Sequence, residues 1–235
     1  MNEHTHKQFD AEMEALRTGV LAMGGMVETQ LMRALDALED GEGVDTLDQV
    51  GSVEQSINQK QVEIDQQCSQ VIAKRQPAAI DLRMILTVTK IVNDLERVGD
   101  EAKKIARKAA QTQNSGRLDR VRQFDATRAL RDAQEMLQLS LDAFARLDLS
   151  AAADVIERDQ VIDSSFDSIV RHLVSYMMED PRTISAALEI VFIAKSIERI
   201  GDHAKNIAEA VVQLVKGKDV RHITAAEMRA EVNEE

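Results

Sequence analysis

The sequence contains very few of the residues that build disulfide-bonded or aromatic-rich proteins. Of its 235 residues, one is cysteine (Cys68), none is tryptophan, and only 3% are aromatic. A single cysteine excludes a disulfide within the chain and is typical of a reducing compartment. There are only two prolines, Pro77 and Pro181, and the hydrophobic residues are mostly Leu, Ile, Val, Ala and Met. This composition favours helices and indicates an all-α fold.

Long hydrophobic runs and an excess of positive charge are also missing. Runs such as 190–194 are much shorter than the roughly 20 apolar residues that span a membrane. Residues 1–6 lack the basic start and apolar run of a signal peptide. The formal net charge of −12 argues against general affinity for nucleic acid. We therefore expect a cytoplasmic protein that binds no nucleic acid and does not insert directly into a membrane.

Apolar residues recur at helical spacing along most of the chain. One clear run contains Leu16, Val20, Met23, Val27, Leu31, Ala34 and Leu38. Turn signals such as Gln76-Pro77, Asp180-Pro181 and Lys216-Gly217 interrupt this pattern. The pattern predicts six long helices near residues 7–40, 45–75, 79–113, 118–147, 151–178 and 183–215.

One signature occurs twice, 102 residues apart. It reads Leu-Glu-Arg-Val-Gly-Asp at 95–100 and Ile-Glu-Arg-Ile-Gly-Asp at 197–202, and each copy continues into Ala-Lys-x-Ile-Ala. Long helices joined by short loops pack as antiparallel neighbours in a bundle. The duplication predicts two tandem three-helix bundles at 1–114 and 115–216, with a boundary around 114–117 and a C-terminal tail at 217–235. A single continuous six-helix bundle is the alternative.

Each signature carries two carboxylates one helical turn apart, Glu96 with Asp100 and Glu198 with Asp202. Like charges at this spacing repel each other, and the glycine between them costs about 1 kcal/mol relative to alanine. The helical phase places the carboxylates on a flank well away from the centre of the apolar seam, so we expect them to line a groove or a surface rather than the bundle interior. Paired hard oxygen ligands suit a cation such as Mg, Ca, Mn or Fe. The alternative is a solvated helix face.

A metal site needs further ligands from neighbouring helices. Asp163 is a candidate, because Asp159-x-x-Ile162-Asp163 matches Glu54-x-x-Ile57-Asn58 in the first half. Asn58 supplies no charge, so the two sites need not be equivalent. His203 follows Asp202, but its phase near the edge of the seam favours a structural role over metal binding.

Motifs of the common enzyme classes are absent from the sequence. The Glu-x-x-His spacing of di-iron bundles occurs only at Glu3 and His6. There is no phosphate-binding loop, nucleophile elbow or paired-cysteine metal motif. We therefore predict a protein that is not an enzyme, with a metal-carboxylate enzyme or metal-storage bundle as the alternative. Residues 97–131 contain ten Lys or Arg and four acids, which indicates either complementation of a helix dipole or a basic docking patch.

Several segments resemble the PhoU family of regulators of bacterial phosphate transport. The resemblance rests on both signatures and on residues 22–28, 72–77, 81–83, 176–180 and 215–217. It implies two three-helix bundles without enzymatic activity. It also implies metal binding at the Glu-x-x-x-Asp pairs, which in some relatives hold multinuclear iron or zinc clusters at the surface.

The same resemblance implies a biological role. Family members are similar to adaptors that repress the phosphate-starvation response and restrain phosphate uptake. The implied partners are the ATPase subunit of the phosphate ABC transporter and a membrane sensor histidine kinase. A homodimer is a further expectation, because exposed bundle faces offer room for a second copy.

Overall fold

The computed structural model describes residues 2–39, 43–113, 120–220 and 225–233, and every regular element in these ranges is helical. The long helices are α1 (Asn2–Glu39), α2 (Gly43–Arg75), α3 (Ala79–Gln113), α4 (Arg120–Arg146), α5 (Leu149–Glu179) and α6 (Ile184–Lys216). A 3-10 turn, η1 (Pro181–Thr183), precedes α6, and a short helix, α7 (Ala225–Asn233), follows it. The predicted all-α fold of six long helices is confirmed, whereas α7 lies in the segment predicted to be a tail.

Local capping explains where several helices begin and end. The Asp148 carboxylate accepts a hydrogen bond from the backbone N–H of Ala151 (3.0 Å), which caps the start of α5. Gly217 adopts a left-handed φ of 73° and donates its N–H to the carbonyl of Gln213 (2.9 Å). This conformation favours glycine and ends α6 at the predicted position.

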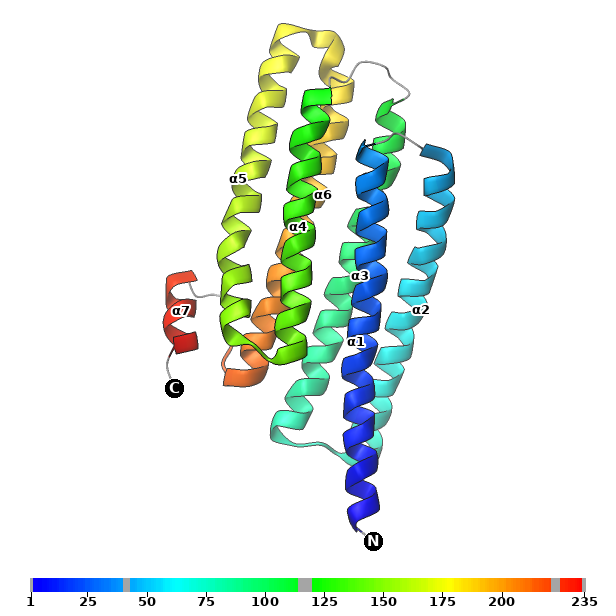
Figure 1. The fold of residues 1–235 in the computed structure, drawn as a ribbon, viewed down its shortest axis with the longest axis vertical. Coiled ribbons are helices and arrows are strands. Elements are labelled where there is room, and N and C mark those ends of the chain that lie inside the picture. Colours follow the sequence, from blue (N-terminus) through cyan, green and yellow to red (C-terminus); the bar gives the residue numbers. More distant parts are fainter. Residues whose placement is uncertain (1, 40–42, 114–119, 221–224, 234–235) are drawn as a thin grey trace.

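The two signature helices lie side by side at the centre of the molecule and run antiparallel (Figure 1). Helices α1–α3 pack as one three-helix unit and α4–α6 as a second, and α3 contacts α6 more extensively than any other pair of described helices. Helices α1 and α4 also contact each other on one side of this pair, while α2 and α5 lie at the outer edges. None of the described helices is long and apolar enough to cross a membrane.

The hydrophobic core is continuous across both units. Leu95, Val98 and Ile105 on α3 belong to the same buried cluster as Ile200 and Ile207 on α6. Full burial of each such side chain contributes about 1.5–3 kcal/mol. The two units therefore share one core. The predicted domain boundary around 114–117 lies outside the described residues, so the division into domains stays a prediction.

Candidate functional site: two carboxylate clusters

The signature glycines lie where neighbouring helices pack closely. A Cβ atom at Gly99 would be 3.3 Å from Cδ1 of Ile57 on α2, and one at Gly201 would be 3.1 Å from Cγ2 of Ile162 on α5. Ile57 and Ile162 are the matched residues of the repeat. Because the glycines have no side chain, α2 and α5 approach the signature helices and bring their own acids toward the signature carboxylates.

The first carboxylate cluster consists of Glu54 on α2 with Glu96 and Asp100 on α3. Lys103 forms an ion pair with Glu54, and Arg97 Nε lies 3.6 Å from a Glu96 carboxylate oxygen. The Glu96 side chain is only 21% exposed. This partial burial raises its pKa, Asp100 raises it further, and Arg97 offsets part of the shift.

The second carboxylate cluster consists of Asp159 and Asp163 on α5 with Glu198 and Asp202 on α6. Lys205 Nζ lies 2.7 Å from Asp159 Oδ2. Lys195 forms an ion pair with Glu198.

Crowding of these carboxylates affects their ionisation. Although Asp202 is exposed, neighbouring atoms partly desolvate its carboxylate, and Glu198, Asp159 and Asp163 repel its charge. The pKa of Asp202 is therefore raised. Desolvation and the charge of Asp159 likewise raise the pKa of Asp163.

The donor chemistry of both clusters fits a hard cation, because every candidate ligand is a carboxylate oxygen. Asp159 is only 5% exposed, and its Oδ1 atom is buried without a hydrogen-bond partner among the described residues. However, no group of three or more His, Cys, Asp or Glu side chains in the described ranges is arranged to hold a metal ion. Lysine ammonium groups contact Glu54 in the first cluster and Asp159 and Glu198 in the second, so lysines compensate part of the negative charge of each cluster.

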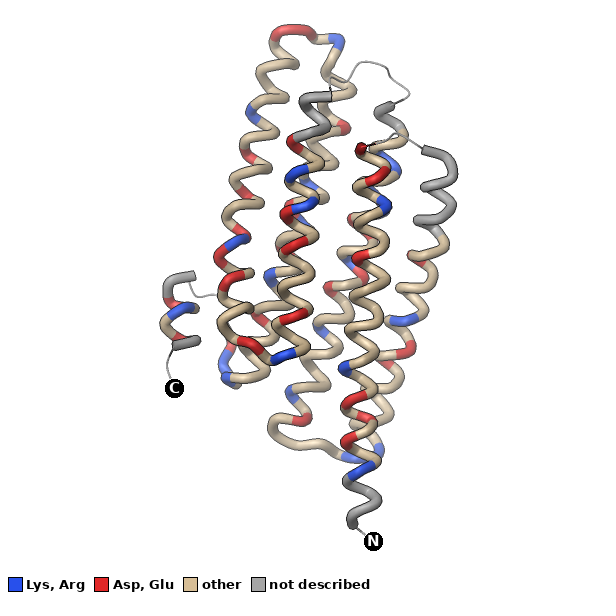
Figure 2. Tube along the Cα trace, viewed as in Figure 1, with Lys and Arg blue, Asp and Glu red and all other residues tan. Residues whose placement is uncertain are grey.

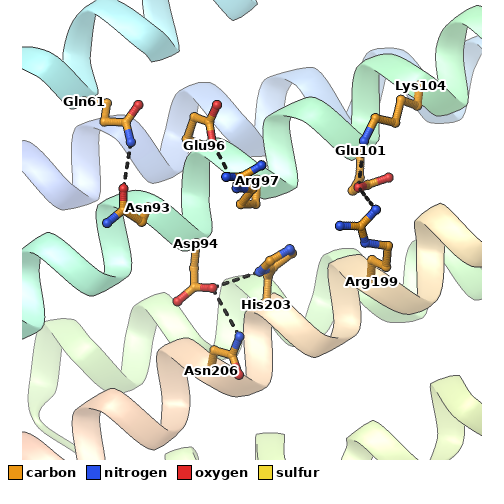
Figure 3. A network of polar contacts seen from close by, with 10 residues as sticks. All are labelled: Gln61, Asn93, Asp94, Glu96, Arg97, Glu101, Lys104, Arg199, His203 and Asn206. Atoms are coloured by element: carbon orange, nitrogen blue, oxygen red, sulfur yellow. Dashed lines mark hydrogen bonds and ion pairs between the residues drawn. The ribbon is translucent and has the colours of Figure 1, made fainter.

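His203 is directed toward α3. Its Nδ1 lies 2.8 Å from Asp94 Oδ1, and Asn206 also donates to this oxygen at 3.2 Å (Figure 3). The contact joins the two three-helix units and occupies one ring nitrogen of His203. This placement supports the structural role that the helical phase favours.

A second polar contact between the units centres on Glu101. Glu101 is 2% exposed. Its carboxylate accepts a hydrogen bond from Lys104 Nζ and lies 2.9 Å from Arg199 Nη1 on α6 (Figure 3). Glu101 and His203 occupy equivalent positions of the repeat. Because one is an acid and the other a histidine, Glu101 pairs with Arg199 on the other signature helix, whereas the equivalent Arg97 lies beside Glu96 on its own helix.

Sequence reasoning missed some of the residues that support these sites. Gln30 on α1 is fully buried and donates from Nε2 to the carbonyl of Gly99 (3.0 Å). Its position between Val27 and Ala34 on the apolar face of α1 is a signal that could have identified it. The pairing of Lys103 and Lys205 with acids was also missed, although both lysines recur at the same place in the repeat.

The basic stretch at 97–131 is largely engaged in ion pairs where the structure describes its side chains. Lys103, Lys104, Lys108 and Arg131 pair with Glu54, Glu101, Glu189 and Glu39, respectively. Figure 2 shows basic residues interspersed with acidic ones along the helices. The described part of the stretch is therefore not a uniformly basic patch.

Similarity to known proteins extends over almost the entire chain. The family model of the PhoU domain matches residues 20–109 and 126–211. The chain belongs to the PhoU family. A Pseudomonas aeruginosa protein named phosphate-specific transport system accessory protein PhoU homolog is 46% identical over 236 residues, covering 99% of this chain and 95% of that protein. The Escherichia coli K12 protein named phosphate-specific transport system accessory protein PhoU is 41% identical over 228 residues, covering 97% and 93%.

Solved structures show the same fold. The crystal structure of PhoU from Pseudomonas aeruginosa matches with a TM-score of 0.85 at 46% identity, covering 89% of this chain and 100% of that one. The phosphate transport system regulatory protein PhoU from Streptococcus pneumoniae matches with a TM-score of 0.83 at 26% identity, covering 90% and 99%. The predicted resemblance is thus confirmed in sequence and in fold.

Proposed function

We propose that this protein is a regulatory accessory protein of phosphate transport that represses the phosphate-starvation response. Its support is the family membership and the nearly full-length similarity to relatives named phosphate-specific transport system accessory proteins. In this proposal the protein is a non-enzymatic, cytoplasmic adaptor. It links the ATPase subunit of the phosphate ABC transporter to a membrane sensor histidine kinase.

An adaptor of this kind acts through different affinities for alternative conformations of its partners. The signature helices carry side chains suited to such contacts, since Arg97 and Phe192 are each more than half exposed and Leu188 is 43% exposed. Exposed cationic and apolar side chains on these helices are the kind of groups that contact protein partners. A homodimer is part of the proposal, and size-exclusion chromatography with light scattering would measure it.

We further propose that Glu96 with Asp100 and Glu198 with Asp202 hold a metal ion, assisted by Asp163. Iron, zinc, manganese, magnesium and calcium are the candidates, and the carboxylate donors favour the harder ions among them. A bound cation would relieve repulsion within each cluster and tie α2 to α3 or α5 to α6. Its role in this proposal is structural.

A reporter of phosphate-responsive transcription tests the regulatory proposal. Deleting the gene should make the reporter constitutive, and the wild-type chain should restore repression in phosphate-rich medium. Unchanged repression after deletion would refute the proposal. Catalytic turnover, or uptake of metal far beyond a few ions per chain, would favour the alternative of an enzyme or a storage protein.

A quadruple alanine variant tests whether the carboxylates participate. It replaces Glu96, Asp100, Glu198 and Asp202, and a control variant replaces four exposed acids on other surfaces, Asp10, Asp36, Asp142 and Glu179. Both variants change the net charge equally. Loss of repression and of metal content in the first variant alone, with helicity retained, would place the clusters in the regulatory function.

A further inference from the structure

We propose that Lys103 and Lys205 are internal counter-ions of the two carboxylate clusters, and that a divalent cation must displace them in order to bind. The inference rests on the proposed metal binding and concerns what opposes it. In the absence of a cation, each lysine takes the place of the metal charge. The clusters are then stable without metal and bind it more weakly than their carboxylates alone would.

The first observation is that the same bridge is built twice. Lys103 lies three residues after Asp100 and Lys205 three residues after Asp202, which places each lysine on the carboxylate-bearing face of its helix. Each lysine then reaches across to the neighbouring helix. Lys103 contacts Glu54 on α2, and Lys205 Nζ lies 2.7 Å from Asp159 Oδ2 on α5. These lysines connect the same pairs of helices that a metal ion would connect.

The second observation is a buried acceptor that the lysine leaves unused. Asp159 is 5% exposed, and while its Oδ2 accepts from Lys205, its Oδ1 has no hydrogen-bond partner among the described residues. A buried polar atom without a partner costs free energy. Asp159 also lies close enough to repel the charges of Asp163 and Asp202. Its Oδ1 is therefore a buried carboxylate oxygen of the second cluster whose hydrogen-bonding capacity one ammonium group leaves unsatisfied.

The two clusters differ in residual charge. The first cluster has three carboxylates and two neighbouring cations, Lys103 and Arg97. It has one carboxylate fewer than the second cluster, because Asn58 occupies the position that corresponds to Asp163. The second has four carboxylates against the two cations Lys205 and Lys195. The second cluster therefore retains more negative charge. We expect it to bind a divalent cation more tightly and to respond more strongly to removal of its lysine.

Titration with Mn²⁺, followed by the electron paramagnetic resonance signal of the free ion, tests this inference on the full-length chain. Lys205→Met keeps the apolar stem and removes the charge. It should raise the Mn²⁺ affinity about tenfold or more, because one positive charge next to the site is removed. Lys103→Met should produce a smaller increase. The control Lys218→Met removes a 63% exposed lysine that pairs with Glu231, and should change the affinity by less than about twofold.

A thermal-unfolding measurement supplies a second readout. Without divalent cations, Lys205→Met should unfold at a lower temperature than the wild-type chain, and Mn²⁺ should raise its midpoint by more than it raises the wild-type midpoint. If Lys205→Met does not fold, Lys205→Gln serves in both experiments, because it removes the charge but keeps a hydrogen-bond donor.

The inference is overturned if removing the lysine charge leaves Mn²⁺ affinity unchanged or lowers it, or if no variant binds Mn²⁺. It is supported if affinity rises for the Lys205 variant and not for the Lys218 control. This outcome is independent of the reporter assay, because a chain that fails to repress transcription can still show the affinity increase. Failure of the regulatory proposal and failure of the counter-ion inference are therefore distinguishable.

Discussion

Substituting Gly201 by alanine should destabilise the protein, although alanine is the better helix former. The new Cβ would lie 3.1 Å from Cγ2 of Ile162 and 3.4 Å from its Cβ. Ile162 is buried, and its β-branched side chain is stiff at χ1. Relief of the contact therefore requires α5 itself to move by a few tenths of an ångström. Such overpacking typically costs about 1–3 kcal/mol, whereas the helix-propensity gain is about 1 kcal/mol. The net effect is a loss of up to about 2 kcal/mol.

Two other glycines provide matched comparisons. At Gly99 the new Cβ would meet Cδ1 of Ile57 at 3.3 Å, and this atom is the far end of its side chain, which yields by a few tenths of an ångström more easily than the atoms next to the backbone that Gly201→Ala would meet. Gly99→Ala should therefore be nearly neutral. Gly25 is exposed, and nothing lies within 4 Å of its added Cβ. Gly25→Ala should stabilise the protein by about 1 kcal/mol.

Urea unfolding monitored by far-UV circular dichroism would rank the three variants by their midpoints, provided that the m-values agree. The expected order of stability is Gly25→Ala, then Gly99→Ala, then Gly201→Ala. If Gly201→Ala were as stable as Gly25→Ala, the signature glycine would not be required for close packing of α5, and the reasoning would be refuted.

Three further predictions concern charged groups, and urea unfolding measures each of them. Arg75 forms a bidentate ion pair with Glu12 at 2.8 Å and lowers the pKa of the Glu12 carboxyl in the folded protein. The ion pair therefore stabilises the folded state fully above the pKa that Glu12 has in the unfolded chain, and this stabilisation is lost as the pH falls through the lower pKa of the folded state. Arg75→Met should therefore lower the urea midpoint at pH 7 and lower it less below about pH 4. An equal loss at the two pH values would contradict the assignment of the stabilisation to this ion pair. Asp202→Asn should raise the midpoint of the metal-free protein at pH 7, because the raised pKa of Asp202 reflects a penalty for ionising it in the folded state. This gain should shrink as the pH falls through the raised pKa toward the ordinary value of about 3.9, and a destabilised variant at pH 7 would disprove the repulsion. Glu101→Gln should cost about 1–2 kcal/mol, because it weakens a buried, charge-assisted contact with Arg199; no change would show that the contact adds nothing to the interface between α3 and α6.

Several elements of the fold were predictable from local sequence signals. Helical spacing predicted α3 at its observed bounds, 79–113, and the bounds of the other long helices to within two residues, except that α1 begins at Asn2 and not near residue 7. The end of α6 was predictable because Gly217 is the residue type that favours its left-handed φ. Helix α7 was missed because it is short and has no long apolar stripe; among its described side chains at 227–231, Met228 is the one buried in the core.

The candidate site was predictable only in part. The pairing of Glu96 with Asp100 follows from helix geometry, since residues four apart lie on one face. The membership of Asp159 in the second cluster depends on how closely α5 approaches α6. The repeat pattern in the sequence indicated that approach only indirectly. The partners of the lysines and of Gln30 were not predictable, because a side chain's partner on another helix depends on the packing register of the two helices.

The sequence by itself determined the helices, their duplication and the two carboxylate pairs, because each of these is encoded in spacing along a single helix. Tertiary structure alone decided that Lys205 neutralises Asp159, that Glu101 engages Arg199 and that His203 contacts Asp94. These contacts join residues 46 to 109 positions apart in the chain, and they form only after α5 packs on α6 and α3 lies antiparallel to α6. The spacing of apolar residues along one helix carries no information about the packing register between two helices, because that register is set by how the apolar seams of the separate helices interlock.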